Sequence, residues 1–157
     1  MRGRTDSAAP MENGRNMALP HHSSLSRTFN GTKRRIYHFL DQMGTSGDHV
    51  WPYASQPFMR TAGPLTPGRT EAWHLGIHAK LDDAVPEERI VWRFLNEGVD
   101  GTHGFYLHSE GKTTTVEHRV DVELAEPDGR LLWRRVEDSQ SRAIEGLFEK
   151  LARALKR

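Results

Sequence analysis

Near residue 130 the spacing of apolar residues changes from that of strands to that of a helix, and this change is the strongest constraint on the fold. Between Trp73 and Leu124 apolar residues recur at every second position, which is typical of half-buried strands. From Arg130 onward the spacing becomes that of an amphipathic helix. Consecutive strands followed by one long helix predict an α+β domain with a mostly antiparallel sheet, and they do not fit the alternating pattern of a doubly wound fold.

Turn signals divide the strand region into four predicted strands. In the first, Trp73, Leu75 and Ile77 share the apolar face, which leaves His74 and His78 on the polar face. Glu110-Gly111 is a hairpin turn signal. One apolar face per strand predicts that one face of the sheet is covered, and the long last helix is the element large enough to cover it. The predicted strands span residues 73–82, 88–95, 102–108 and 112–124.

The part of the chain before these strands has four sections. Residues 1–22 carry Gly, Pro, Ser and Arg without periodicity, and they are expected to form a disordered tail preceding a domain at 23–157. Residues 24–29 are expected to form a short extended segment. Residues 33–43 have helical spacing, with Thr32 as the expected N-cap. An irregular crossing rich in Pro, Gly and aromatic residues leads from there to the first strand of the meander.

Composition narrows the classes of function. The chain has 157 residues, enough for one domain, and a formal net charge of +1, so it lacks the basic charge of a nucleic-acid-binding protein. It contains no cysteine, which excludes thiolate metal sites and a cysteine nucleophile. No apolar run reaches the ~18 residues of a membrane span, and no secretion signal is evident at the N-terminus, so a cytoplasmic location is expected.

The chain carries several short motifs in a fixed order: Trp51-Pro52, Pro64-Leu65 with Gly68, residues 74–78 and 101–105, and residues 115–118 followed by the long last helix. In this order and spacing they resemble the START-type SRPBCC superfamily, which includes polyketide cyclases and dehydrases and lipid-transfer proteins. The likeness covers residues 24–157. It implies a helix-grip fold, in which the sheet curls around the final helix and leaves an elongated cavity. It implies no fixed catalytic residues, since members place different chemistry in that cavity.

The inward side chains of the strands and the last helix are therefore the expected lining of a ligand cavity. An apolar pocket with a few placed polar groups suits an apolar or aromatic small molecule, such as a lipid or a polyketide. The lining candidates are Trp73, Ile77, Trp92, Phe94, His103, Phe105, Leu107, Val116, His118, Val120, Ile144 and Phe148.

His103 and His118 are the candidates for chemistry within that lining. With Glu110-Gly111 as the turn, Phe105 faces Val116 and His103 faces His118 across the hairpin. Three roles remain open for the pair: structural packing, contact with a ligand, or general acid–base catalysis by imidazole. A metal would need a third protein ligand that the sequence does not place nearby, so no metal site is expected.

Two functions follow from this reading, and a third is weighed against them. The first is binding of an apolar small molecule, which needs only the cavity. The second is a cyclase or dehydratase that uses His103 and His118 as acid and base. The third, a partner-binding surface, is disfavoured because the predicted outer face of the sheet is polar and mixed in charge. No phosphate-binding glycine motif or nucleophile elbow is present, so no cofactor is expected.

Overall fold

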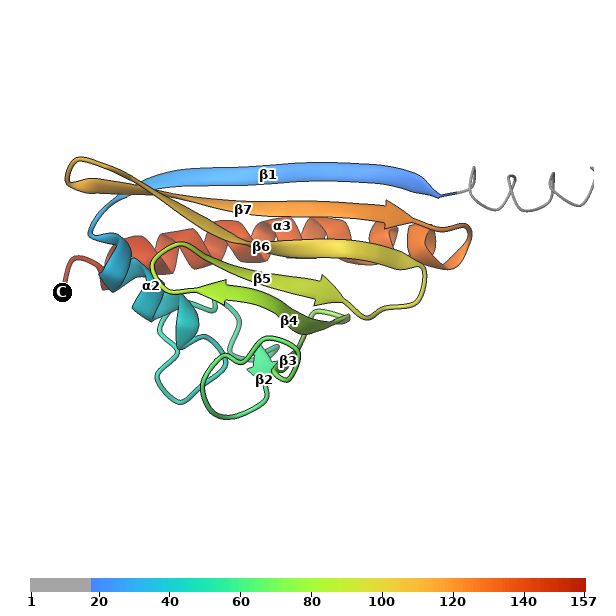
Figure 1. Cartoon of the computed structure of the whole chain (residues 1–157), viewed down its shortest axis with the longest axis horizontal. Helices are drawn as coiled ribbons and strands as arrows, with labels where there is room; N and C mark the ends of the chain where they lie inside the picture. Colours follow the sequence, from blue (N-terminus) through green and yellow to red (C-terminus); the bar gives the residue numbers. More distant parts are fainter. Residues whose placement is uncertain (1–17) are drawn as a thin grey trace, which may run out of the picture.

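The computed structural model describes residues 18–157 as one curved sheet that carries a long helix on one face (Figure 1). The sheet is antiparallel and seven-stranded, in the order β1-β7-β6-β5-β4-β3-β2. Helix α3 runs lengthwise along the strands and contacts β1 and β7. The elements are β1 (Leu19–Asn30), α2 (Lys33–Asp41), β2 (Met59–Arg60), β3 (Glu71–His74), β4 (Ile77–Val85), β5 (Arg89–Phe94), β6 (Val99–Glu110), β7 (Thr113–Leu124) and α3 (Asp128–Ala154).

This architecture confirms the predicted α+β class and the helix-grip arrangement. The strands β4 to β7 form the expected meander. The extended segment expected at 24–29 is part of β1, but this strand is longer than predicted: it begins at Leu19, inside the predicted tail, and pairs with β7 along its whole length. The start of β1 is polar enough to pass for a tail, but an edge strand needs only its main chain to join the sheet. The rest of the predicted tail, residues 1–17, lies outside the described residues.

The predicted strand at 73–82 is instead a tight hairpin. Strand β3 ends at His74, and β4 begins at Ile77, directly opposite it. Leu75 and Gly76 form the turn with positive φ angles of 50° and 83°, as the two central residues of a type I′ turn require. The turn puts His74 and Ile77 on the same, inner face. The sequence-based assignment of faces was therefore wrong for β3: Trp73 is 45% exposed and His74 is buried.

The hairpin of β6 and β7 also has a different register from the predicted one. Glu110 pairs with Thr113, so the turn consists of Gly111 and Lys112 rather than Glu110-Gly111. Gly111 has a φ of +63°, which glycine adopts without steric cost at the first turn position. The pairing shifts by two residues, which keeps every side chain on its predicted face. Phe105 consequently faces His118, and His103 faces Val120 instead of His118.

Helix α2 and the crossing that follows it are held by side chains that bond to the main chain. The Thr32 hydroxyl accepts a hydrogen bond from the Arg35 amide at 3.1 Å, which confirms the predicted N-cap. The Arg60 guanidinium donates to the carbonyls of Met43 and Asp41 at the end of α2. The Trp51 indole donates to the Gln56 carbonyl at 2.7 Å. The irregular crossing is therefore a fixed part of the fold.

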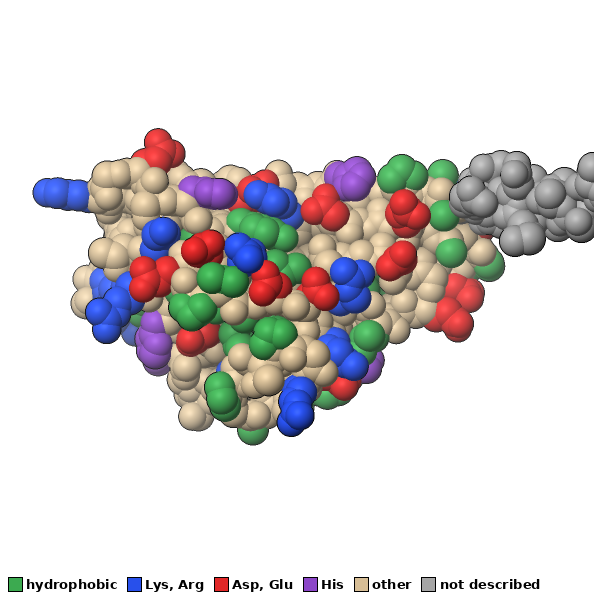
Figure 2. All heavy atoms as spheres, in the orientation of Figure 1, with side chains coloured by type: hydrophobic (Ala, Val, Ile, Leu, Met, Phe, Trp, Pro, Cys, Tyr) green, Lys and Arg blue, Asp and Glu red, His purple; other side chains and the backbone are tan. Residues whose placement is uncertain are grey.

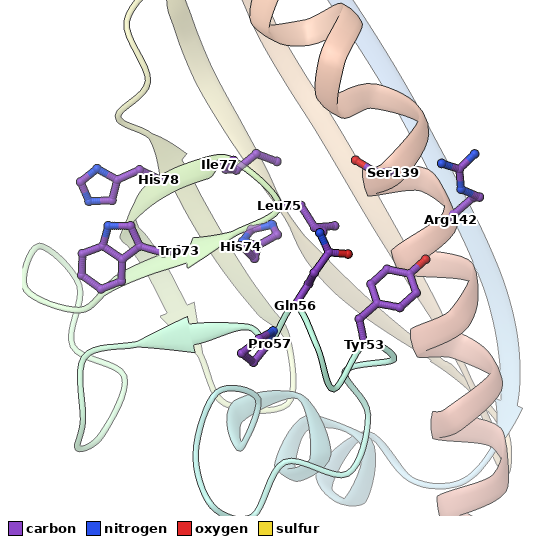
Figure 3. A pocket seen from close by; sticks show the side chains of 11 residues that line it. Tyr53, Gln56, Pro57, Trp73, His74, Leu75, Ile77, His78, Ser139 and Arg142 are labelled. Carbon is purple, nitrogen blue, oxygen red and sulfur yellow. The ribbon is translucent and has the colours of Figure 1, made fainter.

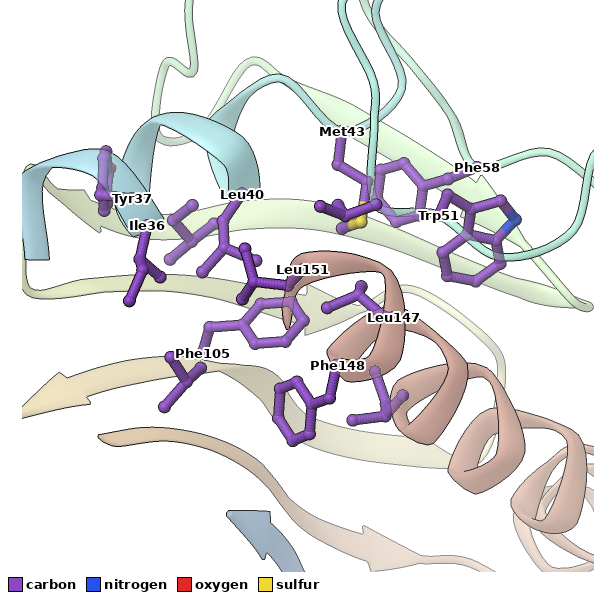
Figure 4. Packing of buried hydrophobic residues seen from close by; sticks show 14 of the residues in the cluster. Ile36, Tyr37, Leu40, Met43, Trp51, Phe58, Phe105, Leu147, Phe148 and Leu151 are labelled. Atoms are coloured by element: carbon purple, nitrogen blue, oxygen red, sulfur yellow. The ribbon is translucent and has the colours of Figure 1, made fainter. Parts of the chain in front are cut away.

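At the end nearest α2, α3 and the sheet enclose a tightly packed apolar core (Figure 4). Leu147 and Leu151 of α3 are completely buried, and Phe105 of β6 lies against them together with Ile36 and Leu40 of α2. A second, smaller cluster lies toward the N-terminal end of α3 and includes Trp133 and Val136. The two clusters are separated by a short polar stretch of the interface.

The opposite, outer face of the sheet is polar and charged. Figure 2 shows Lys and Arg side chains interspersed with Asp and Glu across the molecule. Several of them pair across strands β4 and β5, including Arg89 with Asp83 at 2.6 Å and Arg93 with Asp82 at 3.2 Å. Neither helix of the described chain is long and apolar enough to cross a membrane.

Candidate functional site

Between the two apolar clusters, four polar side chains are buried at the interface of the sheet and α3. Three are histidines, His74 on β3, His103 on β6 and His118 on β7, and the fourth is Gln140 on α3. Each exposes 4–5% of its surface. We call His74, His103 and His118 the histidine row. Because these residues come from four different elements, only the folded chain brings them together.

The curl of the sheet is what closes the histidine row. Strands β3 and β6 are separated by β4 and β5, which would place them roughly 14 Å apart in a flat sheet. The ring centroids of His74 and His103 are nevertheless only 5.4 Å apart, and those of His103 and His118 are 5.7 Å apart. The row therefore crosses the concave face of the sheet from β3 to β7.

These buried polar groups are not satisfied by the protein. His74 Nδ1, His103 Nε2, His118 Nε2 and Gln140 Oε1 each lack a hydrogen-bond partner among the described residues. An unpaired buried donor or acceptor costs about 1–3 kcal/mol, and most buried polar atoms in proteins are paired. Water or a bound molecule would supply the partners that this stretch of the interface lacks.

Burial sets the charge of the row. It lowers the pKa of His74 to about 4, a shift that the nearby Gln140 side chain opposes. It lowers the pKa of His118 to about 3, and the charge of His74 adds to that shift. Burial also lowers the pKa of His103 well below its usual range, and the charges of His74 and then His118 lower it further. All three rings are therefore neutral at pH 7, and each offers one N–H donor and one nitrogen acceptor.

Aromatic rings surround the row on the sheet side and from the crossing. Phe58 stacks on His74 with ring centroids 4.9 Å apart, and Trp51 approaches His74 at 5.5 Å. Phe94 contacts His103 at 4.9 Å, and Phe105 contacts His118 at 5.0 Å. The predicted elongated cavity is therefore partly filled. Side chains of the crossing, together with those of the sheet, occupy the space beside the helix.

The larger opening next to the row is the hairpin pocket, named after the turn at Leu75 and Gly76 (Figure 3). Its volume is about 640 Å³. His74 and Ile77 form its inner wall, Tyr53 and Gln56 reach in from the crossing, and Ser139 faces it from α3. The full lining is Tyr53, Gln56, Pro57, Trp73, His74, Leu75, Gly76, Ile77, His78, Ser139 and Arg142.

A smaller opening, the β1 pocket, lies at the other end of the row. It has a volume of about 190 Å³ and is formed by β1, β7 and α3. His118 and Gln140 line it, so the two pockets meet opposite ends of the same polar stripe. The full lining is Ser23, Ser24, Leu25, His118, Val120, Trp133, Glu137, Gln140, Ser141, Ile144 and Glu145.

The structure divides the predicted lining residues among three places. Trp73 and Ile77 line the hairpin pocket, Trp73 from the outer face, where its ring stacks on His78 at 5.0 Å. His118, Val120 and Ile144 line the β1 pocket. The remaining candidates are buried in the packed interior and line neither pocket: Trp92, Phe94, His103, Phe105, Leu107, Val116 and Phe148.

Sequence reasoning missed His74, Gln140 and Gln56. The signal for His74 was the dipeptide Leu75-Gly76, which stands between two short apolar runs and fits the turn of a two-residue hairpin. The signal for Gln140 was its position midway between Val136 and Ile144, four residues from each, on the apolar stripe of α3. Gln56 gave no signal, because its position depends on the path of an irregular segment.

The three histidines do not form a metal site in this geometry. Among residues 18–157 no group of three His, Asp or Glu side chains converges closely enough to hold a metal ion. The rings follow one another across the sheet instead of surrounding a common point. The arrangement suits a series of hydrogen bonds to neutral groups.

Comparison with known proteins supports the fold. No protein-family model matches the chain, and no curated protein sequence matches it. Among solved structures, Ms6760 from Mycobacterium smegmatis matches with a TM-score of 0.60 and 12% identity over 86% of this chain and 90% of that protein. CV1439 from Chromobacterium violaceum matches with a TM-score of 0.59 and 16% identity over 85% of this chain and 96% of that protein.

A third structural neighbour is DynU16, a protein of the dynemicin biosynthetic locus. It matches with a TM-score of 0.56 and 17% identity over 86% of this chain, which corresponds to 47% of DynU16. At these identities the likeness establishes a shared fold, and a shared fold does not by itself transfer function. The three neighbours therefore support a sheet that grips a long C-terminal helix, and the function has to be argued from the site.

Proposed function

We propose that this protein is a START-type SRPBCC protein that binds an apolar or aromatic small molecule in the hairpin pocket. The observation that carries the proposal is the histidine row, a line of neutral, buried imidazoles. Each has one ring nitrogen that lacks a partner among the described residues, and the His74 end of the row forms part of the pocket wall. A ligand hydroxyl or carbonyl in the pocket would provide the hydrogen bond that His74 lacks.

The lining of the hairpin pocket suits a largely apolar molecule that carries polar substituents. Tyr53, Pro57, Leu75 and Ile77 offer apolar or aromatic surface. A volume of about 640 Å³ is within the ~300–1,000 Å³ range of pockets that hold small organic ligands. The polar groups that would fix the orientation of a ligand belong to Gln56, His74, His78, Ser139 and Arg142.

Binding to emodin, an aromatic polyketide, and to palmitate would test this proposal by isothermal titration calorimetry. We expect emodin to bind, and we expect His74→Phe to weaken its binding by roughly tenfold, the effect of one lost hydrogen bond. The matched control is His108→Phe, which changes an exposed histidine of β6 that lines neither pocket. If neither compound binds, or if both variants weaken binding equally, the hairpin pocket is not a site for such ligands.

Acid–base catalysis of the cyclase or dehydratase type is the second candidate. It is favoured by the direct succession of imidazoles, and a structural neighbour comes from a biosynthetic locus. Against it stand the pKa values of about 4 for His74 and about 3 for His118, since efficient general bases titrate near the working pH. Ligand binding therefore ranks first.

Replacing His103 and His118 together with Gln separates the two functions. If they are catalytic, turnover of a polyketide substrate should be lost while emodin affinity changes little. If they only orient a ligand, affinity should fall and no turnover should be found in either protein. A double variant that unfolds would assign both residues a structural role.

A further inference from the structure

The β1 pocket has chemistry of its own, distinct from that of the hairpin pocket. All three of its buried polar side chains have an unpartnered atom: His118 Nε2, Gln140 Oε1 and Trp133 Nε1. Each of these side chains exposes 4–5% of its surface. Buried polar atoms that lack partners and line a hollow indicate that the hollow receives a molecule with hydrogen-bonding groups.

The charges of the β1 pocket are all negative. Glu137 and Glu145 of α3 line it, and no Lys or Arg does. Glu137 contacts His21 of β1, with His21 Nε2 and Glu137 Oε2 at 3.2 Å, whereas Glu145 forms no ion pair with any residue between 18 and 157. Because burial keeps the His118 ring neutral at pH 7, it does not offset this charge. The pocket therefore favours a cation over an anion.

The remaining surface of the β1 pocket is apolar and limited in size. Leu25, Val120 and Ile144 supply aliphatic walls, and Trp133 supplies an aromatic ring. The volume of about 190 Å³ corresponds to roughly six water molecules at ~30 Å³ each. A ligand with one small ring or a short chain would fill it. Ser23, Ser24 and Ser141 add hydroxyl groups to the lining.

We propose that the β1 pocket is a second ligand site, which binds the ammonium group of a small organic amine with a compact apolar body. The three N–H groups of the ammonium would donate hydrogen bonds to the carboxylates of Glu137 and Glu145 and to Gln140 Oε1. His118 Nε2, in the tautomer that carries its proton on Nδ1, would accept a hydrogen bond from a hydroxyl substituent of the amine or from water. The Trp133 ring attracts a cation at its face, and its N–H suits an oxygen substituent on the amine. This site does not depend on ligand binding in the hairpin pocket.

The test compares three probes of nearly equal shape: benzylamine, benzyl alcohol and benzoate. The Trp133 indole N–H peak in a ¹H–¹⁵N spectrum reports on the pocket, and the loss of one indole peak in Trp133→Phe assigns it. We expect benzylamine to shift this peak saturably and to bind about tenfold or more tightly than benzyl alcohol, with benzoate weakest. Equal binding of the amine and the alcohol, stronger binding of benzoate, or no saturable shift would overturn the proposal.

Variants of the acidic residues on α3 show whether the ammonium binds at the carboxylates of the β1 pocket. The double variant Glu137→Gln, Glu145→Gln should weaken the binding of benzylamine by about tenfold and leave the binding of benzyl alcohol unchanged. Asp138→Asn is the matched control, because it removes one negative charge from an exposed neighbour on α3 that does not line the pocket. The single variant Glu145→Gln is measured beside this control. If Asp138→Asn weakens the binding of benzylamine as much as Glu145→Gln does, the attraction is a general surface effect and no amine site exists. Emodin binding, measured on the same variants, reports on the hairpin pocket separately.

Discussion

Helix α3 packs against the sheet in two different ways along its length. Near α2 it buries Leu147 and Leu151 completely in an apolar core. Two to three turns earlier, the same face of the helix buries Gln140 opposite His74, and both have polar atoms without partners. Hydrophobic packing explains the first stretch fully. It does not explain the second, where partly satisfied polar groups weaken the fold and are best understood as contacts for a bound molecule.

The largest expected effect tests the packed stretch. Leu147→Ala should lower the free energy of unfolding by about 2–5 kcal/mol, because it removes a fully buried side chain and leaves a cavity in a filled core. Urea denaturation followed by circular dichroism measures it. A loss below about 1 kcal/mol would mean that the interface around Leu147 is loosely packed, so that the two stretches of α3 do not differ in packing.

The histidine row should make stability depend on pH. The folded-state pKa of His74 is about 4 and that of His118 about 3, whereas an unfolded histidine titrates near 6.5. Between these values the unfolded chain binds more protons, so stability is fully present above pH 6.5 and falls as the pH decreases toward 4. His74 alone would account for roughly 3 kcal/mol, at 1.36 kcal/mol per pKa unit.

Urea denaturation from pH 7 to pH 4 measures that dependence, with His74→Phe as the comparison. The variant should show a clearly shallower decline over the same range. If the free energy of unfolding of the variant falls with pH as much as that of the parent protein, the pKa of His74 is the same in the folded and unfolded chain. The histidine row would then be more hydrated than its burial indicates.

A smaller effect is expected at the start of α2. Thr32→Ala should lower stability by about 1 kcal/mol, because it removes the hydroxyl that accepts a hydrogen bond from the Arg35 amide. Thermal unfolding monitored by circular dichroism is sufficient. Thr32→Ser, which keeps the hydroxyl, should behave like the parent, and equal losses in the two variants would argue against capping.

The smallest expected change is the most informative about the polar stretch. His118→Leu replaces a buried group that has an unpartnered nitrogen with an apolar one, so its free energy of unfolding should lie within about 1 kcal/mol of the parent value. Binding of benzylamine should weaken in the same variant. A loss of more than about 2 kcal/mol in chemical denaturation would assign His118 a structural role and remove the contrast between the two stretches.

Much of this fold could be predicted from the sequence, because periodicity reports which face each residue takes. The meander from β4 to β7, helix α2 with its cap and the long last helix all follow from that pattern. The inward positions of His103 and His118 followed too, even though their pairing was predicted two residues out of register. A shift by an even number of residues preserves the faces of a strand and changes only the partners.

The candidate site was only partly predictable, since its parts meet through long-range curvature. Ile77 and His118 were expected inside for the right reason, whereas His74 was assigned to the outer face because the turn at Leu75 was not recognised. That His74 lies 5.4 Å from His103 depends on the curl of the whole sheet, which no local pattern encodes. The first part of strand β1, before the segment expected at 24–29, was missed because its polar residues concealed main-chain pairing with β7.

The two-residue turn at Leu75 and Gly76 sets which of two neighbouring side chains belongs to the interior. With this turn, His74 lies inside opposite Ile77, and Trp73 lies outside opposite His78. A turn longer or shorter by one residue would let the incoming strand slide by one position and exchange the two. The wall of the hairpin pocket would then present an indole in place of an imidazole, although no residue of the strand had been substituted. Loop length at this point is therefore a means by which related chains could diversify what they bind.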